Sequence, residues 1–227
     1  MRLFGGSRTA RADRVPPGPL RDYLNTPAPD AATPLAGARL LAVDVETTGL
    51  DPAKDQLLSI GFVPVDGDRI ELAGAGQVLV RPSGEVGDSA RFHGLTDDAL
   101  IPGVGLAEAM DVLFAALAGR VLLAHHAAIE TGFLGRACEQ LYGVRPPFTV
   151  VDTMSLQFGL LSQGFDDEPP PGSLRLWAAR SQYGLPRYAA HAALTDALAC
   201  AELYLAQAAE LQTTGPRTLK SLAKGRF

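Results

Sequence analysis

Cysteine is scarce in this chain, with only Cys138 and Cys200 among 227 residues. The two lie far apart and neither has a Cys-x-x-Cys partner, so the sequence predicts neither a disulfide framework nor a zinc knuckle. Such cysteine usage is typical of a reducing compartment, and we expect a cytoplasmic location. Both thiols fall within apolar helical patterns and are expected to be buried as small hydrophobic side chains.

Long apolar runs are also missing. No stretch approaches the roughly 18 apolar residues that a membrane-spanning helix needs, and no apolar segment typical of a secretory signal follows the basic N-terminal residues. We therefore expect no membrane association. Hydrophobic residues still make up 47% of the chain and charged residues 20%, which is typical of a folded globular domain and not of a disordered chain.

The chain has no overall basic excess, and its formal net charge of -5 argues against a general nucleic-acid coat protein. The charge is unevenly distributed. Residues 1–21 carry five arginines and one aspartate, and residues 211–227 carry four basic residues and no acid, so the acidic excess lies in residues 22–210. The basic ends are equally compatible with phosphate contacts and with solvated tails.

Composition divides the chain into three parts. Residues 1–36 are rich in Pro, Ala and Arg without a sustained period, and we expect an extension that lies on the domain or is disordered. Residues 37–210 contain the apolar patterns and are expected to form the folded domain. Residues 211–227 are expected to form a basic tail.

The first half of the domain predicts three antiparallel strands. Residues 39–45 form a bounded apolar run that suits a buried central strand. Residues 56–65 suit a second strand, and the Asp66-Gly67-Asp68 turn leads into a third strand over residues 70–82. Strands linked this tightly are antiparallel.

The second half alternates helical and strand patterns. Hairpin strands followed by βα units predict a mixed α/β sheet with parallel strands in its second half, flanked by helices. Residues 164–173 are expected to form a loop because they are rich in Pro, Gly and acidic residues. The expected elements are helices over 106–117 and 127–141, short strands over 121–124 and 148–152, a helix after the second of these, and a last helix carrying Leu194, Leu198, Ala201 and Leu205.

Two carboxylates mark the end of the expected central strand. Asp44 and Glu46 point to the same face because strand side chains alternate. Two converging carboxylates are unfavourable unless a cation neutralises them. The Thr-Thr-Gly that follows makes the pattern more specific than an isolated Asp-x-Glu, because glycine lets the backbone turn tightly beside a bound group.

Two further segments carry titratable side chains. Glu130 lies on an otherwise apolar helical face, and taken alone it is expected to reach solvent rather than serve a site. His191 precedes Asp196 by five residues, about 140° around a helix, so the two converge only if His191 lies just before the helix and Asp196 in its first turns. Taken alone, His191 is expected to be a helix-start residue exposed to solvent.

The ordered set of motifs resembles a known family. DVETTG (44–49), AHHAAIETGFL (124–134) and HAALTD (191–196) are similar to the motifs of the DEDD superfamily of 3′–5′ exonucleases, in the branch with a catalytic histidine. Members of that superfamily include the proofreading subunit of bacterial DNA polymerase III and ribonuclease T. The HGLT (93–96) and VDT (151–153) segments strengthen the resemblance, which covers about residues 39–210. It implies a ribonuclease-H-like fold with a mixed five-stranded sheet.

The resemblance also implies a site. Asp44, Glu46 and Asp196 would be metal ligands and His191 the general base. Two ions, Mg²⁺ or Mn²⁺, would lie at the phosphodiester, and Glu130 would serve the second. In the second motif the family usually has Asn where this chain has His126, and Asp where it has Glu130, whose longer side chain must be accommodated.

The implied substrate is the 3′ end of a single-stranded nucleic acid, with DNA favoured over RNA, and the implied product is a nucleoside 5′-monophosphate. A polymerase or a repair assembly is the implied partner. Asp152 is expected to cap the helix that follows it. The residues expected to contact the terminal nucleotide are Thr47, Thr48, Leu50 and His93.

Two other functions remain open on the sequence alone. One is a catalytically weakened nucleic-acid-binding module, in which the altered second motif has ended hydrolysis. The other is an accessory subunit of a replication or repair assembly that docks through its Pro-rich N-terminal segment. Three intact carboxylates and an intact His191 favour the enzyme, since a binding module needs none of them.

Overall fold

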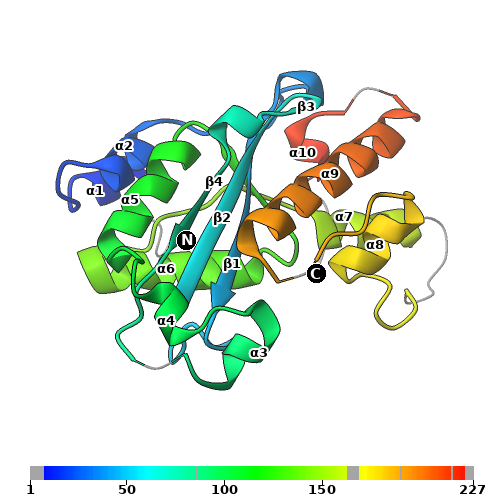
Figure 1. The fold of residues 1–227 in the computed structure, drawn as a ribbon. Helices are drawn as coiled ribbons and strands as arrows, with labels where there is room; N and C mark the ends of the chain where they lie inside the picture. Colours follow the sequence, from blue (N-terminus) through cyan, green and yellow to red (C-terminus); the bar gives the residue numbers. More distant parts are fainter. Residues whose placement is uncertain (1–7, 85, 163–168, 190, 216, 223–227) are drawn as a thin grey trace.

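A mixed sheet between two layers of helices forms the centre of the molecule (Figure 1). The computed structural model describes residues 8–84, 86–162, 169–189, 191–215 and 217–222. One apolar core fills the space between the sheet and α5 and α6, and a second fills the space between the sheet and α9. The predicted α/β architecture is confirmed.

Strand β1 (Arg39–Thr47) lies in the middle of the sheet, which has the order β3-β2-β1-β5-β6. Strand β2 (Leu57–Asp66) pairs with β1 in antiparallel fashion. Strands β5 (Val121–Ala124) and β6 (Val150–Asp152) continue the sheet in parallel. The predicted directions are confirmed, and the parallel strands end at the same edge of the sheet as β1.

The prediction of one continuous third strand was wrong. The segment forms β3 (Arg69–Ile70), a 3₁₀ turn (Leu72–Gly74) and β4 (Gly76–Leu79), so the sheet has six strands and not five. Both β3 and β4 pair with β2. The interruption lies opposite Pro64, which has no N–H to donate to a neighbouring strand.

Helices from distant parts of the chain cover one face of the sheet. These are α5 (Leu106–Leu117) and α6 (Ala128–Tyr142), as predicted, joined by α1 (Arg8–Ala12) and α2 (Pro19–Asn25). Leu20, Tyr23 and Leu24 of α2 are buried in this core. The described part of the N-terminal extension therefore lies on the domain.

The other face carries α7 (Thr153–Leu161), α8 (Leu176–Gln182) and the long α9 (Ala193–Gln212). The predicted last helix is confirmed, and small side chains such as Ala197 and Ala201 bring it close to the strands. A short helix, α10 (Leu219–Leu222), buries Leu219 and Leu222 in the same core. The C-terminal segment is therefore not solely a solvated tail.

The remaining elements are short. The 3₁₀ turn Gly87–Ser89, α3 (Ala90–His93) and α4 (Asp97–Leu100) form the connection between β4 and α5, and a further 3₁₀ turn (Leu35–Gly37) precedes β1. Residues 163–168 lie outside the described part of the chain, so the loop predicted over 164–173 is described only from 169. Both cysteines are free and buried, as expected. None of the described helices is long and apolar enough to span a membrane.

Candidate active site

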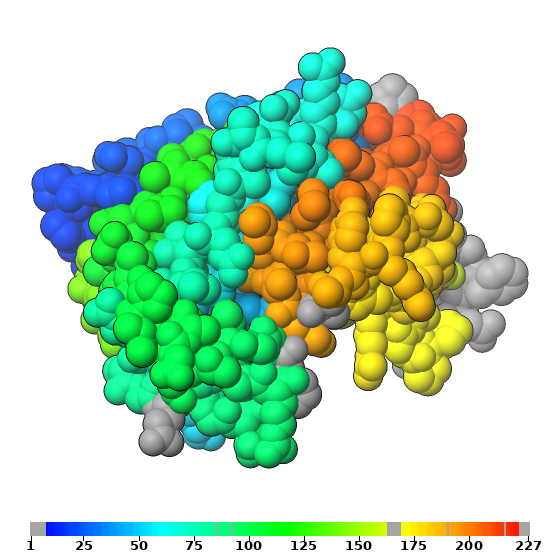
Figure 2. Space-filling model, in the orientation of Figure 1, coloured from blue at the N-terminus to red at the C-terminus, as the bar shows by residue number. Residues whose placement is uncertain are grey.

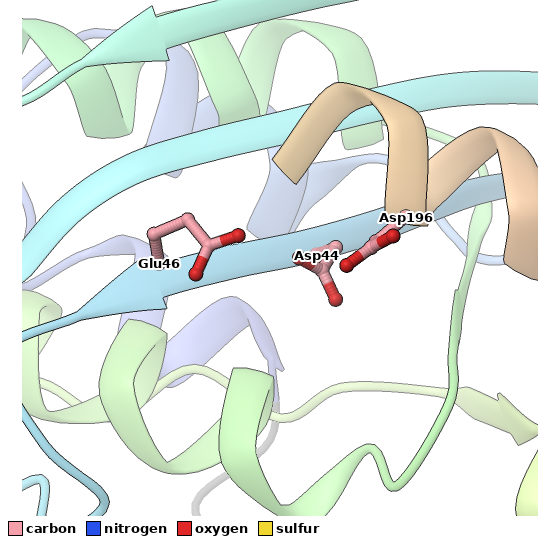
Figure 3. A group of neighbouring side chains, drawn as sticks. All are labelled: Asp44, Glu46 and Asp196. Atoms are coloured by element: carbon pink, nitrogen blue, oxygen red, sulfur yellow. The ribbon is translucent and has the colours of Figure 1, made fainter. Parts of the chain in front are cut away.

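The end of the central strand presents two carboxylates on one face. Along β1, Leu41, Val43 and Val45 belong to the core beneath α5 and α6, while Leu40 and Ala42 belong to the core beneath α9. Strand alternation therefore directs Asp44 and Glu46 to the α9 side. The shared face predicted from the spacing is what the structure shows (Figure 3).

Asp196 reaches the same place from the first turn of α9. His191 lies before the helix, with its backbone in the left-handed region at φ 66°, and its N–H donates to Asp196 Oδ2 over 2.9 Å. This is the arrangement that convergence of the two residues requires. This hydrogen bond holds the Asp196 carboxylate in place and also holds the backbone of His191 just before α9.

Oxygen atoms of Asp44, Glu46 and Asp196 all lie within 4.8 Å of one another (Figure 3). Glu46 and Asp196 are buried and Asp44 is half-buried. Three carboxylates this close form a cluster of hard oxygen donors of the kind that Mg²⁺ and Mn²⁺ prefer.

Glu130 contributes a fourth carboxylate from the first turn of α6. Its side chain is only 3% exposed, which excludes the solvent-directed alternative. It is close enough to raise the pKa of Asp44 electrostatically, although it is not part of the three-residue cluster. Its Oε2 atom is buried without a hydrogen-bond partner.

Burial raises the pKa values of all four carboxyl groups, and repulsion from neighbouring members of the group adds to this at Asp44 and Glu46. Burial is the main cause at Asp44, followed by the charges of Glu130, Asp196 and Glu46. Burial and then Asp196 raise the pKa of Glu46 to about 7. Burial raises the pKa of Glu130 to about 8 and also raises that of Asp196.

The cluster fits divalent cations. Asp196 Oδ1, like Glu130 Oε2, is buried and without a partner. Buried carboxylate oxygens without a donor are unfavourable, and a cation supplies the positive charge that they lack. All four side chains offer oxygen ligands.

A pocket of about 460 Å³ opens beside the cluster. Leu50 is 77% exposed at this pocket, which leaves a large apolar surface free for contact. The face in Figure 2 is indented between the green segment around α3 and the yellow segment around α8. The pocket lining includes Glu46, the predicted substrate contacts Thr47, Thr48, Leu50 and His93, and the predicted base His191.

Backbone and side-chain bonds shape the turn that follows β1. Thr48 Oγ1 donates to Asp55 Oδ1 over 3.2 Å and accepts from the N–H of Gln56 over 2.9 Å. A Cβ atom on Gly49 would lie 2.4 Å from Asp55 Oδ2, so a side chain at 49 would displace that carboxylate. The glycine of the first motif therefore leaves the room that the Asp55 carboxylate occupies in this turn.

His93, the last residue of α3, also lines the pocket. Its Nδ1 accepts a hydrogen bond from the N–H of Leu95 over 3.1 Å, while Nε2 is buried without a partner. Partial burial, and then the charge of His191, lower the pKa of His93. The structure thus places His93 and His191 in the lining of one pocket.

Asp152 organises the second motif. It caps α7, as predicted, accepting from the N–H of Met154 over 2.9 Å. It also accepts from the N–H groups of His126 and Ala127 over 3.0 and 2.9 Å, which the sequence did not predict. His126 has φ 71°, a conformation that favours Gly or Asn over most residues. Asp152 therefore holds the start of the helix that carries Glu130.

Gly61, which was not among the residues predicted from the sequence, lies where α9 approaches the sheet closely beside Asp44. It lies opposite Asp44 in the β1–β2 register, and the backbone of Ala193 packs directly on it. The available signal was a glycine within an otherwise apolar strand, which often marks a close backbone approach.

Residues 41–204 match the family model described as Exonuclease (RNase_T). The chain is 27% identical over 188 residues to the PolC-type DNA polymerase III of Thermotoga maritima, covering 82% of this chain but 13% of that protein. It is 29% identical over 168 residues to the DNA polymerase III subunit epsilon of Treponema pallidum, covering 72% and 73%. The chain thus spans about an eighth of the PolC-type polymerases that it matches.

Solved structures show the same fold. The nuclease domain of 3′hExo, a DEDDh family member bound to rAMP, superposes with a TM-score of 0.63 at 17% identity, over 78% of this chain and 93% of that one. Escherichia coli exonuclease I in complex with a dT13 oligonucleotide superposes with a TM-score of 0.62 at 15% identity, over 74% and 40%. With the family match spanning the first and last motifs, the chain belongs to the exonuclease (RNase_T) family.

Proposed function

We propose that this protein is a metal-dependent 3′–5′ exonuclease that releases nucleoside 5′-monophosphates from single-stranded nucleic acid ends. The observation that carries the proposal is the convergence of Asp44, Glu46 and Asp196 beside the pocket that His191 lines. The family match supports the reaction class.

The carboxylates would hold the cations. Asp44, Glu46 and Asp196 would bind one divalent ion, and Asp44 and Glu130 would serve a second. Bound ions of this kind neutralise phosphate charge and make water more acidic. Because the pKa values of Glu46 and Glu130 are raised to about 7 and 8, cation binding must also displace protons near neutral pH.

His191 would act as the general base. Its side chain lines the same pocket as Glu46, which supports a role in deprotonating a water bound at this site. The neutral ring accepts the proton of that water. Asp196 keeps the His191 backbone in place through the 2.9 Å bond, so one carboxylate serves both the cation site and the base.

The pocket would receive the terminal nucleotide. Leu50 offers an exposed apolar surface for a base, and the Thr47–Thr48 turn and His93 offer polar contacts. DNA is the favoured substrate because the polymerase relatives are DNA polymerases and exonuclease I is similar in fold in a complex with dT13. A polymerase or a repair assembly is the proposed partner on the same ground.

Degradation of end-labelled oligonucleotides tests the proposal. A 5′-labelled single-stranded DNA should yield a descending ladder with Mn²⁺ or Mg²⁺, and a 3′-labelled strand should release labelled mononucleotide at once. A matched RNA should be degraded more slowly. EDTA and the Asp44→Asn variant should abolish both signals. Release of mononucleotides from the 5′ end first would contradict the proposed polarity.

A weakened nuclease that acts as a binding module is the second candidate. The observation that favours it is the position of Glu130 outside the three-carboxylate cluster, with glutamate where the resembled family has aspartate. Retardation of the oligonucleotide without cleavage by either ion would support this candidate and overturn the first.

A further inference from the structure

The loop that carries His191 is held by a charged cluster outside the cation site. His191 lies between the end of α8 at Gln182 and the start of α9 at Ala193, and its backbone is left-handed at φ 66°. That conformation is unfavourable for a residue with a Cβ atom, so surrounding contacts must hold it.

Arg180 of α8 ties this loop to α9. Its side chain is among the largest fully buried ones, at 1% exposure. The guanidinium donates to the carbonyl oxygen of Ala199 over 2.6 Å, to that of Pro186 over 2.8 Å and to Glu202 Oε2 over 2.7 Å. Ala199 and Glu202 belong to α9 and Pro186 to the loop, so one side chain links the two.

Tyr188 attaches the loop to the same carboxylate. Its hydroxyl donates to Glu202 Oε1 over 2.8 Å, so each oxygen of Glu202 has its own donor. The guanidinium carbon of Arg180 lies 5.0 Å from the centre of the Tyr188 ring and 5.3 Å from that of Trp177. Arg180 thus lies against two aromatic rings while it binds the loop.

Two hydrogen bonds to α9 therefore hold the loop, one just before His191 and one at His191 itself. Tyr188, three residues before it, is bound to Glu202, and the His191 N–H is bound to Asp196. Both acceptors are side chains of α9, and Asp196 is also a member of the three-carboxylate cluster. The backbone of His191 is thereby tied to α9, which also carries Asp196 of the proposed cation site.

We propose that Arg180, Glu202 and Tyr188 are positioning residues that place His191 for proton transfer. A buried ion pair is a poor device for stability alone, because apolar side chains of similar size often stabilise as well. Its directional bonds do fix geometry, and small displacements of a catalytic group are costly in rate. This inference rests on the proposed function, in which His191 is the base.

Tyr188→Phe tests the inference with the smallest change, since it removes only the hydroxyl that binds Glu202. The kcat for oligonucleotide hydrolysis should fall about tenfold with KM nearly unchanged, because the base is displaced while the pocket is kept. Tyr183→Phe is the matched control. It removes a hydroxyl bonded to Glu210 in the same connection, and kcat should stay at the wild-type value.

A double variant separates positioning from a general structural role. His191→Asn removes the base while keeping a residue type that tolerates the left-handed backbone. In this background Tyr188→Phe should have no further effect on kcat. An equal loss in both backgrounds would overturn the positioning role and leave the proposed base intact. Wild-type activity of His191→Asn alone would instead overturn the proposed base, and the inference with it.

Histidine NMR of the cation-free protein gives a readout independent of activity. The chain has four histidines, and the His191 imidazole signals are assigned by their loss in His191→Asn. Tyr188→Phe and Arg180→Lys should shift or broaden these signals. The signals of His125, which is held by Thr153 and Leu174, should not move. Unchanged His191 signals in Tyr188→Phe would overturn the proposal, whether or not Arg180→Lys folds.

Discussion

Gly61 of β2 and Ala193 of α9 are in backbone contact. A Cβ atom added to Gly61 would lie 2.2 Å from the carbonyl carbon of Ala193, closer than any side-chain carbon can approach. Gly61 is the β2 partner of Asp44 in the antiparallel register, and Ala193 is three residues before Asp196. Because Gly61 has no side chain, the start of α9 can pack close to the sheet beside β1. This brings the Asp196 carboxylate close to that of Asp44.

Gly61→Ala should therefore separate the carboxylates. The added methyl must push α9 away from β2, and overpacking of this kind costs about 1–3 kcal/mol of unfolding free energy. Mn²⁺ binding should weaken and hydrolysis fall about 10²-fold, because the ligands no longer converge. Calorimetric Mn²⁺ titration and single-turnover cleavage measure the two effects.

Gly159→Ala is the control for that variant. Gly159 lies in α7 with open space around its Cβ position, and alanine favours a helix by up to about 1 kcal/mol. Stability should not fall and activity should not change. Equal Mn²⁺ affinity for Gly61→Ala and Gly159→Ala would refute the role given to the Gly61 contact.

Asp44→Asn should stabilise the cation-free protein while abolishing hydrolysis. The ionised Asp44 carboxylate is repelled by the charges of Glu130, Asp196 and Glu46, and a neutral asparagine amide is not. In EDTA at about pH 8, thermal melting should therefore occur above the wild-type temperature, because the ionised state is the one that repulsion destabilises. Cleavage should drop by about 10²-fold or more. Normal turnover by the folded variant would remove Asp44 from the site.

Stability without cations should rise as the pH falls. The folded-state pKa values of Glu46 and Glu130, about 7 and 8, lie above the ordinary value of 4.5. The folded protein therefore binds more protons than the unfolded chain across this window, and its free energy of unfolding increases from about pH 8 towards pH 5. Thermal melting in EDTA measures the trend, and saturating Mn²⁺ should flatten it. Stability that climbs with pH in EDTA would contradict the assigned shifts.

His191→Asn should slow hydrolysis by roughly 10²–10⁴-fold, the usual effect of losing a positioned base. Mn²⁺ affinity should change little, because the backbone N–H that binds Asp196 is retained and the imidazole is not a proposed ligand. Single-turnover rates and calorimetry provide the two measurements. A parallel loss of Mn²⁺ binding would assign His191 to the cation site instead.

Variants of Glu130 test how the site accommodates glutamate, whose side chain is one methylene longer than that of aspartate. Glu130→Ala should be severely impaired, and wild-type hydrolysis should be faster with Mn²⁺ than with Mg²⁺, which demands stricter octahedral geometry. Glu130→Asp should also lose activity, since the shorter side chain falls short by about one methylene in a site built around glutamate. Single-turnover cleavage with each ion distinguishes the variants. Full Mg²⁺-dependent activity of Glu130→Ala would exclude it from the site.

Local sequence patterns determined much of this protein. The bounded apolar run over residues 39–45 indicated the central strand. Asp44 and Glu46 could then be assigned to one face, because side chains alternate along any strand. Helical spacing located α5, α6 and α9 in the same way. The order of the motifs was enough to indicate the exonuclease family, since it is a property of the chain alone.

The tertiary structure alone decided how those pieces meet. The sequence left open whether Glu130 is buried and whether His191 lies before its helix, because both depend on packing against residues far away in the chain. Pro64 interrupts the third strand only because β3 and β4 pair with β2 on either side of it. Gly61 matters only because the backbone of α9 approaches it. The periodicity of hydrophobic residues shows in which direction a side chain points from its own helix or strand. The distance between two backbones is set by the whole fold.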